Sequence, residues 1–299
     1  MTVLALLHDG TRIGLSAWTI HWSTVVGLAA LGALYFWRAR IAPADRGATL
    51  PASIATDETH RTPTHGQRLS FVAGLLVIFV SLNGPIHDLS DYYLFSAHMV
   101  QHLLLTLVAP PLLLAGVPGW MLRPALAVRG IGAIARRVTR VGAAYLIFNL
   151  VVAAWHLPPI YNTAMANHGV HIAQHLMFMA AAVLMWWPLM SPLPELPRIA
   201  YPAQMLYCFL MTIPMSIVSI YITMADSVLY PAYAAAPRTW GLSPMEDQMI
   251  GGLIMWIPGG LFFLGVMSVV FFKWSARGED HAAGAQIDWR PGVHAAGKV

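Results

Sequence analysis

Charged side chains are scarce in this chain of 299 residues, because Asp, Glu, Lys and Arg together make up only 10% of it, whereas hydrophobic residues make up 58%. A soluble domain of this length needs more charge than that to cover its surface. The composition therefore excludes an ordinary soluble globule and predicts a polytopic membrane protein. The net charge of +4 is small, and the sequence carries no signature of nucleic-acid binding.

Cysteine is nearly absent as well. Cys208 is the only cysteine and lies within an apolar run, which excludes a disulfide framework, a CxxC redox pair and a thiolate metal cluster from this chain. Neither an HExxH sequence nor the Ser, His and Asp order of hydrolases occurs, and we expect a protein that is not an enzyme. The apolar N-terminus lacks a preceding basic segment and a small-residue cleavage site, so we expect no cleaved signal peptide.

Long apolar runs are abundant instead. Seven of them can cross a hydrocarbon layer about 30 Å thick as helices. We therefore expect an all-α membrane domain of seven transmembrane helices over residues 1–274. Residues 38–68 and 275–299 are polar and rich in Ala with Pro or Gly, and we expect a mobile cytoplasmic loop and a polar cytoplasmic tail there. The seven runs lie near residues 18–37, 69–86, 94–116, 141–157, 168–188, 200–224 and 249–272.

Two motifs within these runs carry local expectations. Ala109-Pro110-Pro111 removes two backbone donors from the third run and predicts a kink or break in that helix. Trp186-Trp187-Pro188 at the end of the fifth run and Lys273-Trp274 at the end of the seventh are typical of anchors at the membrane interface.

Basic residues predict the orientation of the helices. Fifteen of the 17 Lys and Arg residues fall in the loops after the first, third and fifth runs or in the C-terminal tail, and only Arg12 and Arg238 fall on the opposite side. Because short basic loops stay in the cytoplasm, this split predicts an extracytoplasmic N-terminus and a cytoplasmic C-terminus. Seven spans require the two ends to lie on opposite sides, which agrees.

Histidines occur at helical spacing within the apolar runs. His98 and His102 are four residues apart, and His168, His171 and His175 follow at spacings of three and four, so each set occupies one face of its helix. An imidazole inside a bilayer span is costly and usually faces a protein interior or a wet cavity. The predicted orientation puts both sets at the extracytoplasmic ends of their helices. The other histidines in or beside the runs fall at the same end: His21, His87 and His156.

Such histidine stripes on facing helices can present several nitrogen ligands to one metal ion. Nitrogen ligands suit copper and zinc, and thioethers near the same end would favour Cu(I). Asp226, Glu246 and Asp247 also fall at this end, where they can complete a coordination sphere, orient an imidazole or cap a helix. The methionines near this end are Met99, Met165, Met224, Met245 and Met249.

Two other interpretations of the histidines stay open. Buried imidazoles can hydrogen-bond across helices or line a proton path without binding a metal. Haem held by one histidine from each of two helices is a second alternative, although further histidines one turn away would crowd the slot that a porphyrin needs. The spacing therefore favours an ion over haem.

The same residues resemble those of a known family of seven-helix membrane proteins, the CtaG assembly factors of caa3-type cytochrome c oxidase. The resemblance covers most of the membrane domain but neither the 38–68 loop nor the tail. It implies a role in making active haem-copper oxidase in a bacterial plasma membrane, and it implies copper handling. It rests on His98-Met99-x-Gln101-His102 followed by Ala109-Pro110-Pro111-Leu112, on Trp155-His156-x-Pro158 with Tyr161, on His171-x-x-x-His175 followed by Trp186-Trp187-Pro188, and on Glu246-Asp247-Gln248 before Gly251-Gly252.

We therefore expect a membrane-embedded assembly factor that binds copper from the extracytoplasmic side and supports maturation of the oxidase copper centre. The expected partners are cytochrome c oxidase subunits, a periplasmic copper donor and the lipid bilayer, with copper ahead of zinc or haem as the bound group. A copper transporter and a haem-binding membrane oxidoreductase remain the alternatives. The expected metal ligands are His98, His102, His171 and His175, with His156, His168 and Asp247 as further candidates.

Overall fold

The computed structural model describes residues 18–41, 62–238 and 241–287, and within these ranges the chain forms helices and no strand. The nearly continuous apolar runs explain this, because in a bilayer a helix satisfies every backbone donor and acceptor internally. In chain order the elements are α1 (Trp22–Arg40), α2 (His65–Ser81), α3 (Gly84–Tyr92), α4 (Phe95–Leu103), the π-helical turn η2 (Leu104–Val108), α5 (Ala109–Gly116), α6 (Gly119–Ala127), α7 (Ile131–Val138), α8 (Val141–His156), α9 (Pro158–Ala166), α10 (His168–Met190), α11 (Tyr201–Thr223), α12 (Pro231–Ala234) and α13 (Pro244–Ile287).

Each predicted apolar run coincides with a helix, but fewer than seven helices qualify as membrane spans. Four helices qualify without a break. Two further spans result only if the pair α2 and α3, bent by 43°, and the pair α7 and α8, bent by 82°, are each counted as one span. α2 and α8 alone have 17 and 16 residues, which is short of the roughly 20 that a bilayer requires. The described residues thus form a helical membrane protein with four to six candidate spans, and the predicted seven are not confirmed. The four unbroken candidates are Phe95–Gly116, His168–Met190, Tyr201–Thr223 and Pro244–Arg277.

The two segments expected to be irregular are shorter than predicted. α1 runs to Arg40 and α2 begins at His65, while residues 42–61 of the expected loop lie outside the described residues. α13 continues to Ile287, so the expected tail begins inside a helix, and residues 288–299 lie outside the described part of the chain.

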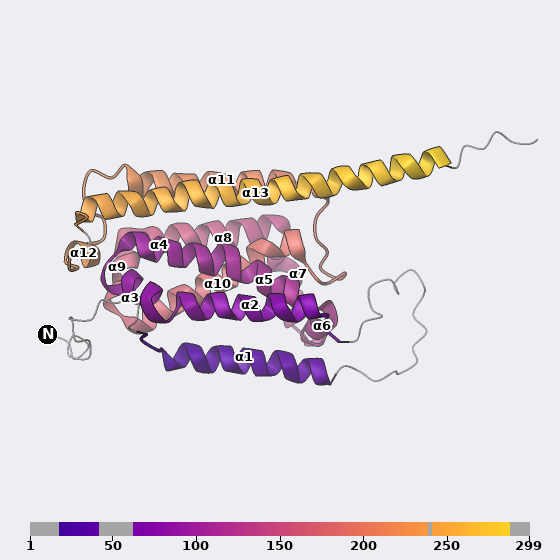
Figure 1. Ribbon diagram of the computed structural model, residues 1–299, viewed down its shortest axis with the longest axis horizontal. Coiled ribbons are helices and arrows are strands. Elements are labelled where there is room, and N and C mark those ends of the chain that lie inside the picture. Colours follow the sequence, from indigo (N-terminus) through magenta and orange to yellow (C-terminus); the bar gives the residue numbers. More distant parts are fainter. Residues whose placement is uncertain (1–17, 42–61, 239–240, 288–299) are drawn as a thin grey trace, which may run out of the picture.

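The long helices lie roughly parallel to one axis of the molecule (Figure 1). α11 and α13 pair closely, and α13 also packs against α4, which leads through η2 into α5. α10 packs against α8 and α5, and α2 lies between α5 and the outermost helix, α1. The short helices α3, α9 and α12 lie at the end of the bundle where α4 and α10 begin, whereas α6 and α7 lie at the opposite end.

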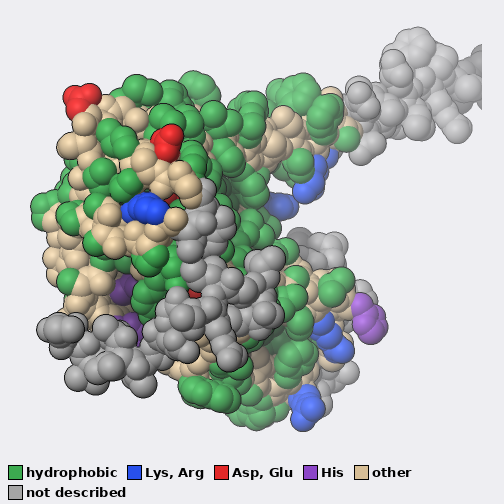
Figure 2. Space-filling view, turned by 60° about the vertical axis from the view of Figure 1, so that its left-hand side comes forward, with side chains coloured by type: hydrophobic (Ala, Val, Ile, Leu, Met, Phe, Trp, Pro, Cys, Tyr) green, Lys and Arg blue, Asp and Glu red, His purple; other side chains and the backbone are tan. Residues whose placement is uncertain are grey.

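The two ends of the bundle differ in charge. Apart from Arg238, the described Lys and Arg side chains lie at one end of the bundle or in the last turns of α13. That end is formed by the C-terminus of α1, the N-terminus of α2, the α10–α11 connection, and helices α6 and α7. Figure 2 brings the other end forward, where a small histidine surface (purple) reaches the outside among apolar side chains. The histidines in or beside the apolar runs and most basic residues therefore occupy opposite ends, as the predicted orientation requires, whereas His65 lies at the basic end. The sidedness itself stays a prediction.

The two prolines of the third run do not break its helix, which passes into α5 through η2. The Ala109 N–H donates to the carbonyl of Leu104, five residues earlier instead of four. Pro110 has no N–H for the carbonyl of Thr106, and the Trp186 indole donates to that carbonyl instead, at 3.0 Å. Trp186 is only 2% exposed, so it is a buried donor and the expectation of an interfacial anchor was wrong.

Close helix packing fixes the beginning of α4 beside α13. A Cβ atom at Gly251 would lie 2.4 Å from the Phe95 ring, so α13 approaches this closely only because Gly251 has no side chain. Phe95 in turn stacks on Tyr230, with ring centroids 4.6 Å apart. A buried cluster therefore holds this end of the bundle, consisting of Phe95, Met99, Tyr161, Ile222, Tyr230, Tyr233 and Met255.

Candidate metal centre

Five histidine side chains from three helices meet at one end of the bundle: His98 and His102 of α4, His171 and His175 of α10, and His156 of α8. The ring centroids of His98 and His102 are 4.2 Å apart, and those of His171 and His175 are 4.5 Å apart. Across helices, His98 lies 5.7 Å from His171, and His102 lies 5.7 Å from both His156 and His175. These five residues, the histidine cluster, bring together the two stripes predicted from the sequence.

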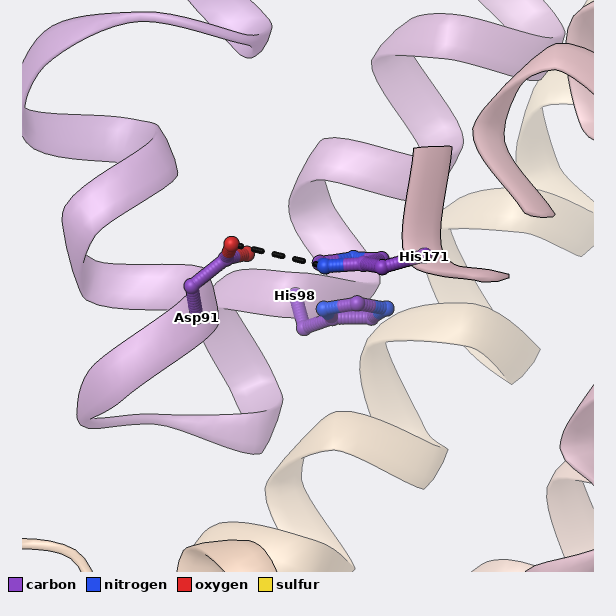
Figure 3. A group of neighbouring side chains, drawn as sticks. All are labelled: Asp91, His98 and His171. Atoms are coloured by element: carbon purple, nitrogen blue, oxygen red, sulfur yellow. Dashed lines mark ion pairs between the residues drawn. The ribbon is translucent and has the colours of Figure 1, made fainter. Parts of the chain in front are cut away.

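A carboxylate adjoins the cluster where it reaches the end of the bundle. Asp91 Oδ2 lies 3.5 Å from His171 Nδ1 (Figure 3). The same oxygen lies 3.4 Å from His87 Nε2. Ligand atoms of Asp91, His98 and His171 all lie within 4.8 Å of one another, which is close enough for one ion to reach all three. In Figure 3 the rings of His98 and His171 lie one above the other, and their interplanar angle is 20°.

Hydrogen bonds fix the carboxylate and its neighbouring imidazole. Gln101 Nε2 lies 3.2 Å from His87 Nδ1 and donates to the carbonyl of Ser81 at 2.7 Å. His87 therefore accepts at Nδ1, and its Nε2–H points to Asp91. In the same way, Asp91 can accept a hydrogen bond from a protonated Nδ1 of His171. Because the neutral ring carries only this one proton, the lone pair of His171 Nε2 is then available to a metal.

The cluster contains several buried imidazole nitrogens without a hydrogen bond. Within the described part of the chain, both nitrogens of His98, His102 and His175 and Nε2 of His156 and His171 have no partner. The Ser90 carbonyl is close to His98 but makes no regular hydrogen bond with it. Buried polar groups are nearly always paired, and each group left alone costs about 1–3 kcal/mol. So many unpaired nitrogens in one place fit a site that holds a metal ion.

Two helix caps hold the stripes in position. Asn167 begins α10, where its side-chain oxygen accepts from the N–H of Val170 at 3.2 Å. Asp247 of α13 caps α4 from outside, because its carboxylate accepts from the N–H groups of Phe95 at 2.7 Å and Ser96 at 3.1 Å. The Ser96 hydroxyl donates to the same carboxylate at 2.6 Å. Asp247 thus acts on the start of α4, one turn before His98.

The other acidic candidates and His168 lie outside the cluster. Glu246 forms a capping box with Ser243, as the capping interpretation expected, and Asp226 is exposed. His168 is exposed at the start of α10, although it belongs to the same stripe as His171. Among the five methionines considered, Met99 is 1% exposed beside the cluster, whereas Met224 and Met249 are 66% and 42% exposed.

Sequence reasoning missed Asp91 and gave no role to His87. The signal that could have found them is the spacing of four between the two residues, the same spacing that singled out His98 and His102. They fall in α3, a nine-residue helix at the end of the bundle that the sequence suggested only as part of an outer loop.

The donor set determines what the cluster can bind. Neutral imidazole nitrogens with one nearby carboxylate suit copper or zinc and do not suit magnesium or calcium, which prefer oxygen ligands. The rings contact one another and Phe178, whose centroid lies 4.4 Å from that of His102. A porphyrin needs a wide slot between its two axial ligands, so this packing favours a single ion over haem.

Comparison with known proteins gives a family match over most of the chain. The model of the family described as cytochrome c oxidase caa3 assembly factor (Caa3_CtaG) matches residues 48–277. These residues include the whole histidine cluster, Asp91 and Asp247.

Similar proteins of undescribed function occur in mycobacteria. A protein of Mycobacterium bovis and one of Mycobacterium tuberculosis are each 25% identical to the chain over 200 residues, which cover 62% of the chain and 30% of the relative. A protein of Mycobacterium leprae is 23% identical over 247 residues, which cover 75% of the chain and 36% of the relative. The chain thus spans about a third of the length of these relatives. No solved structure matches it.

Proposed function

We propose that this chain, which belongs to the family of caa3-type cytochrome c oxidase assembly factors, assists this assembly by binding copper at the histidine cluster. Copper is the cargo of this protein and is passed on to the copper centre of the oxidase. The partners that this role requires are a periplasmic copper donor and the oxidase subunits, met in a bacterial plasma membrane.

The observation that carries the proposal is the set of buried, unpaired imidazole nitrogens on His98, His102, His171 and His175. A polar network that only joined helices would pair these nitrogens with one another or with backbone groups. Here neighbouring rings lie 4.2 to 6.0 Å apart between centroids, without a hydrogen bond among them within the described residues. Such an arrangement suits nitrogens that share an ion.

The members of the site differ in exposure at the end of the bundle, which suggests a route for the cargo. The side chains of Asp91 and His171 are 10% and 8% exposed, whereas His98 is 0% exposed. An ion arriving at this end would first meet the Asp91 carboxylate, whose oxygens can bind a cation, and would then exchange onto neutral imidazoles. Release to the oxidase would follow the same residues in reverse.

The direct test measures metal binding by the purified full-length chain after His98 and His175 are both replaced by Phe. Phe keeps an aromatic ring in each place and removes nitrogens that have no partner, so stability without metal should be retained or should rise. Thermal stabilisation by added copper should fall sharply, whereas a wild type at 100 times its dissociation constant gains about 2.7 kcal/mol. His65→Asn is the matched control, because His65 is exposed at the opposite end of the bundle.

The same variant tests function in cells. We expect oxidase protein and its haems to be present while oxidase copper falls, and added copper should restore part of the activity. Loss of haem from the oxidase would contradict copper delivery. Copper binding at the wild-type level, with the oxidase still failing, would mean that the histidines only support a docking surface.

A further inference from the structure

A cavity of about 30 Å³ adjoins the histidine cluster on its inner side, enclosed by α4, η2, α8, α10, α11 and α13. This volume is the space open to the centre of a water-sized sphere, and about 10–15 Å³ of it suffices for one water molecule. The cavity therefore has room for an ion. Its walls are mostly apolar, and its polar or sulfur-bearing lining consists of His102, His156, Thr106, Asn149, Met99, Met215 and Met255.

The two histidines in this wall have nitrogens available for a ligand. His156 Nδ1 lies 2.7 Å from the carbonyl of Val152, and because a carbonyl only accepts, Nδ1 carries the proton. Nε2 of the neutral ring is then an acceptor, and it has no partner in the described structure. Both nitrogens of His102 are also without a partner there. His156 is only 3% exposed and His102 only 6%.

The methionines in the wall come from three different helices. Met99 of α4 and Met255 of α13 are 1% and 4% exposed. Met215 of α11 packs against Gly259, where a Cβ atom would come within 2.2 Å of its Cε and 3.0 Å of its Sδ. Gly259 therefore keeps the space that the Met215 thioether occupies.

The hydrogen-bond donors of the other two polar side chains in the cavity are occupied locally. The Thr106 hydroxyl donates to the carbonyl of His102 at 2.6 Å, and the Asn149 amide donates to the carbonyl of Tyr145 at 2.8 Å. The soft or borderline groups that remain for a ligand are imidazole nitrogens and thioether sulfurs, beside the amide oxygen of Asn149 and the hydroxyl oxygen of Thr106. Soft sulfur with imidazole is the donor set that selects Cu(I) over divalent ions.

We infer that this cavity is a second, inner metal site, which holds Cu(I) between His102, His156 and the thioethers of Met215, Met255 and Met99. The inference rests on the proposed copper role, but it adds a separate station with a different ligand preference. The outer part of the cluster, with nitrogen and carboxylate ligands, accepts borderline divalent ions as well, whereas the inner site is selective for a soft monovalent ion. Copper enters already as Cu(I), so no electron transfer is needed.

Silver(I) tests this site because it is soft, monovalent and stable in air, and zinc(II) serves as the borderline comparison. The full-length chain would be titrated with each ion after Met215 and Met255 are both replaced by Leu, a change that nearly conserves volume. Loss of a group that merely supports a ligand costs about 10–100-fold in affinity, so loss of two ligands should weaken Ag(I) binding by at least about 10-fold. Zn(II) binding should be unchanged.

Met224→Leu with Met249→Leu is the matched control, because these two methionines are exposed and belong to the end of α11 and to α13. X-ray absorption of the Cu(I)-loaded wild type should show sulfur neighbours whose number falls in the Met215 and Met255 variant and is unchanged in the control. Ag(I) affinity unchanged in that variant, but lost after His98 and His175 are replaced by Phe, would overturn the inner site and leave the proposed function intact. Loss of neither ion in any variant would overturn both.

Discussion

Replacement of Asp247 by Asn should destabilise the protein through helix α4, although Asp247 belongs to α13. Its carboxylate is 0% exposed and accepts three hydrogen bonds, from Phe95 N, Ser96 N and Ser96 Oγ, at 2.7, 3.1 and 2.6 Å. A hydrogen bond to a charged group contributes about 1.5–3 kcal/mol and one between neutral groups about 0.5–1.5 kcal/mol. Loss of the charge should therefore cost about 1 kcal/mol for each bond.

The amide brings a further cost, because its NH₂ group cannot accept a hydrogen bond from the donors that faced the second carboxylate oxygen. Since the three bonds share one acceptor group, their contributions are not additive, and we expect a total loss of about 2–4 kcal/mol in the free energy of unfolding. The start of α4 should fray, and because His98 lies in its first turn, copper binding should weaken in parallel.

The assay is unfolding of the full-length chain in mixed micelles, followed by tryptophan fluorescence, with and without copper. Glu246→Gln is the matched control: it removes a neighbouring carboxylate that caps its own helix at the surface, so its effect should be much smaller. If Asp247→Asn and Glu246→Gln unfolded alike, Asp247 would not hold α4, and the positioning of His98 would need another explanation.

Three further predictions follow from single contacts. Trp186→Phe should lower the free energy of unfolding by about 1–3 kcal/mol, measured by thermal unfolding. The Thr106 carbonyl, to which Pro110 cannot donate, would then lose its indole donor as well. A reporter active only outside the cytoplasm should work when fused after Pro158 and fail after Arg129, and the reverse pattern would put the cluster on the cytoplasmic side. Asp91→Asn should weaken Zn(II) binding by about 10–100-fold, whereas Asp88→Asn on the same helix, whose carboxylate accepts from a threonine hydroxyl instead, should not.

The long helices could be predicted because each depends on its own residues. The run expected near residues 168–188 corresponds to α10, and the run near residues 200–224 corresponds to α11, since twenty apolar residues have few alternatives to a helix in a membrane. The bends between α2 and α3 and between α7 and α8 were not predicted. They depend on how short amphipathic helices pack at the ends of the bundle, and apolar runs carry no such information.

The site was predictable in part for the same reason. The spacing of four places His98 above His102, and His171 above His175, whatever the rest of the fold does. Contacts between distant segments required the structure. The pairing of Asp247 with the start of α4 joins residues 152 positions apart in the sequence, which no spacing rule could have found.

Transport across the membrane and delivery at one face make different demands on the inner half of the bundle. Transport would require the inner cavity to continue towards the end that carries the basic residues. Beyond the cavity the helices instead enclose a cluster of large buried side chains, in which Met185, Trp186 and Phe263 are 0%, 2% and 1% exposed. The Trp186 indole is held by its hydrogen bond to Thr106, and the Tyr207 hydroxyl donates to the carbonyl of Met185 at 2.9 Å.

An ion moving further inwards would have to displace these packed rings and break both hydrogen bonds. The soft side chains in the buried part of that cluster, Met185, Cys208 and Met211, are themselves 0%, 0% and 1% exposed. A close-packed interior resists such a rearrangement, because its side chains lose contacts when they move apart. The cargo would therefore leave through the end at which it entered. Such a return path suits a protein that holds copper for an extracytoplasmic acceptor, and it is the physical reason for preferring delivery to the oxidase over transport into the cell.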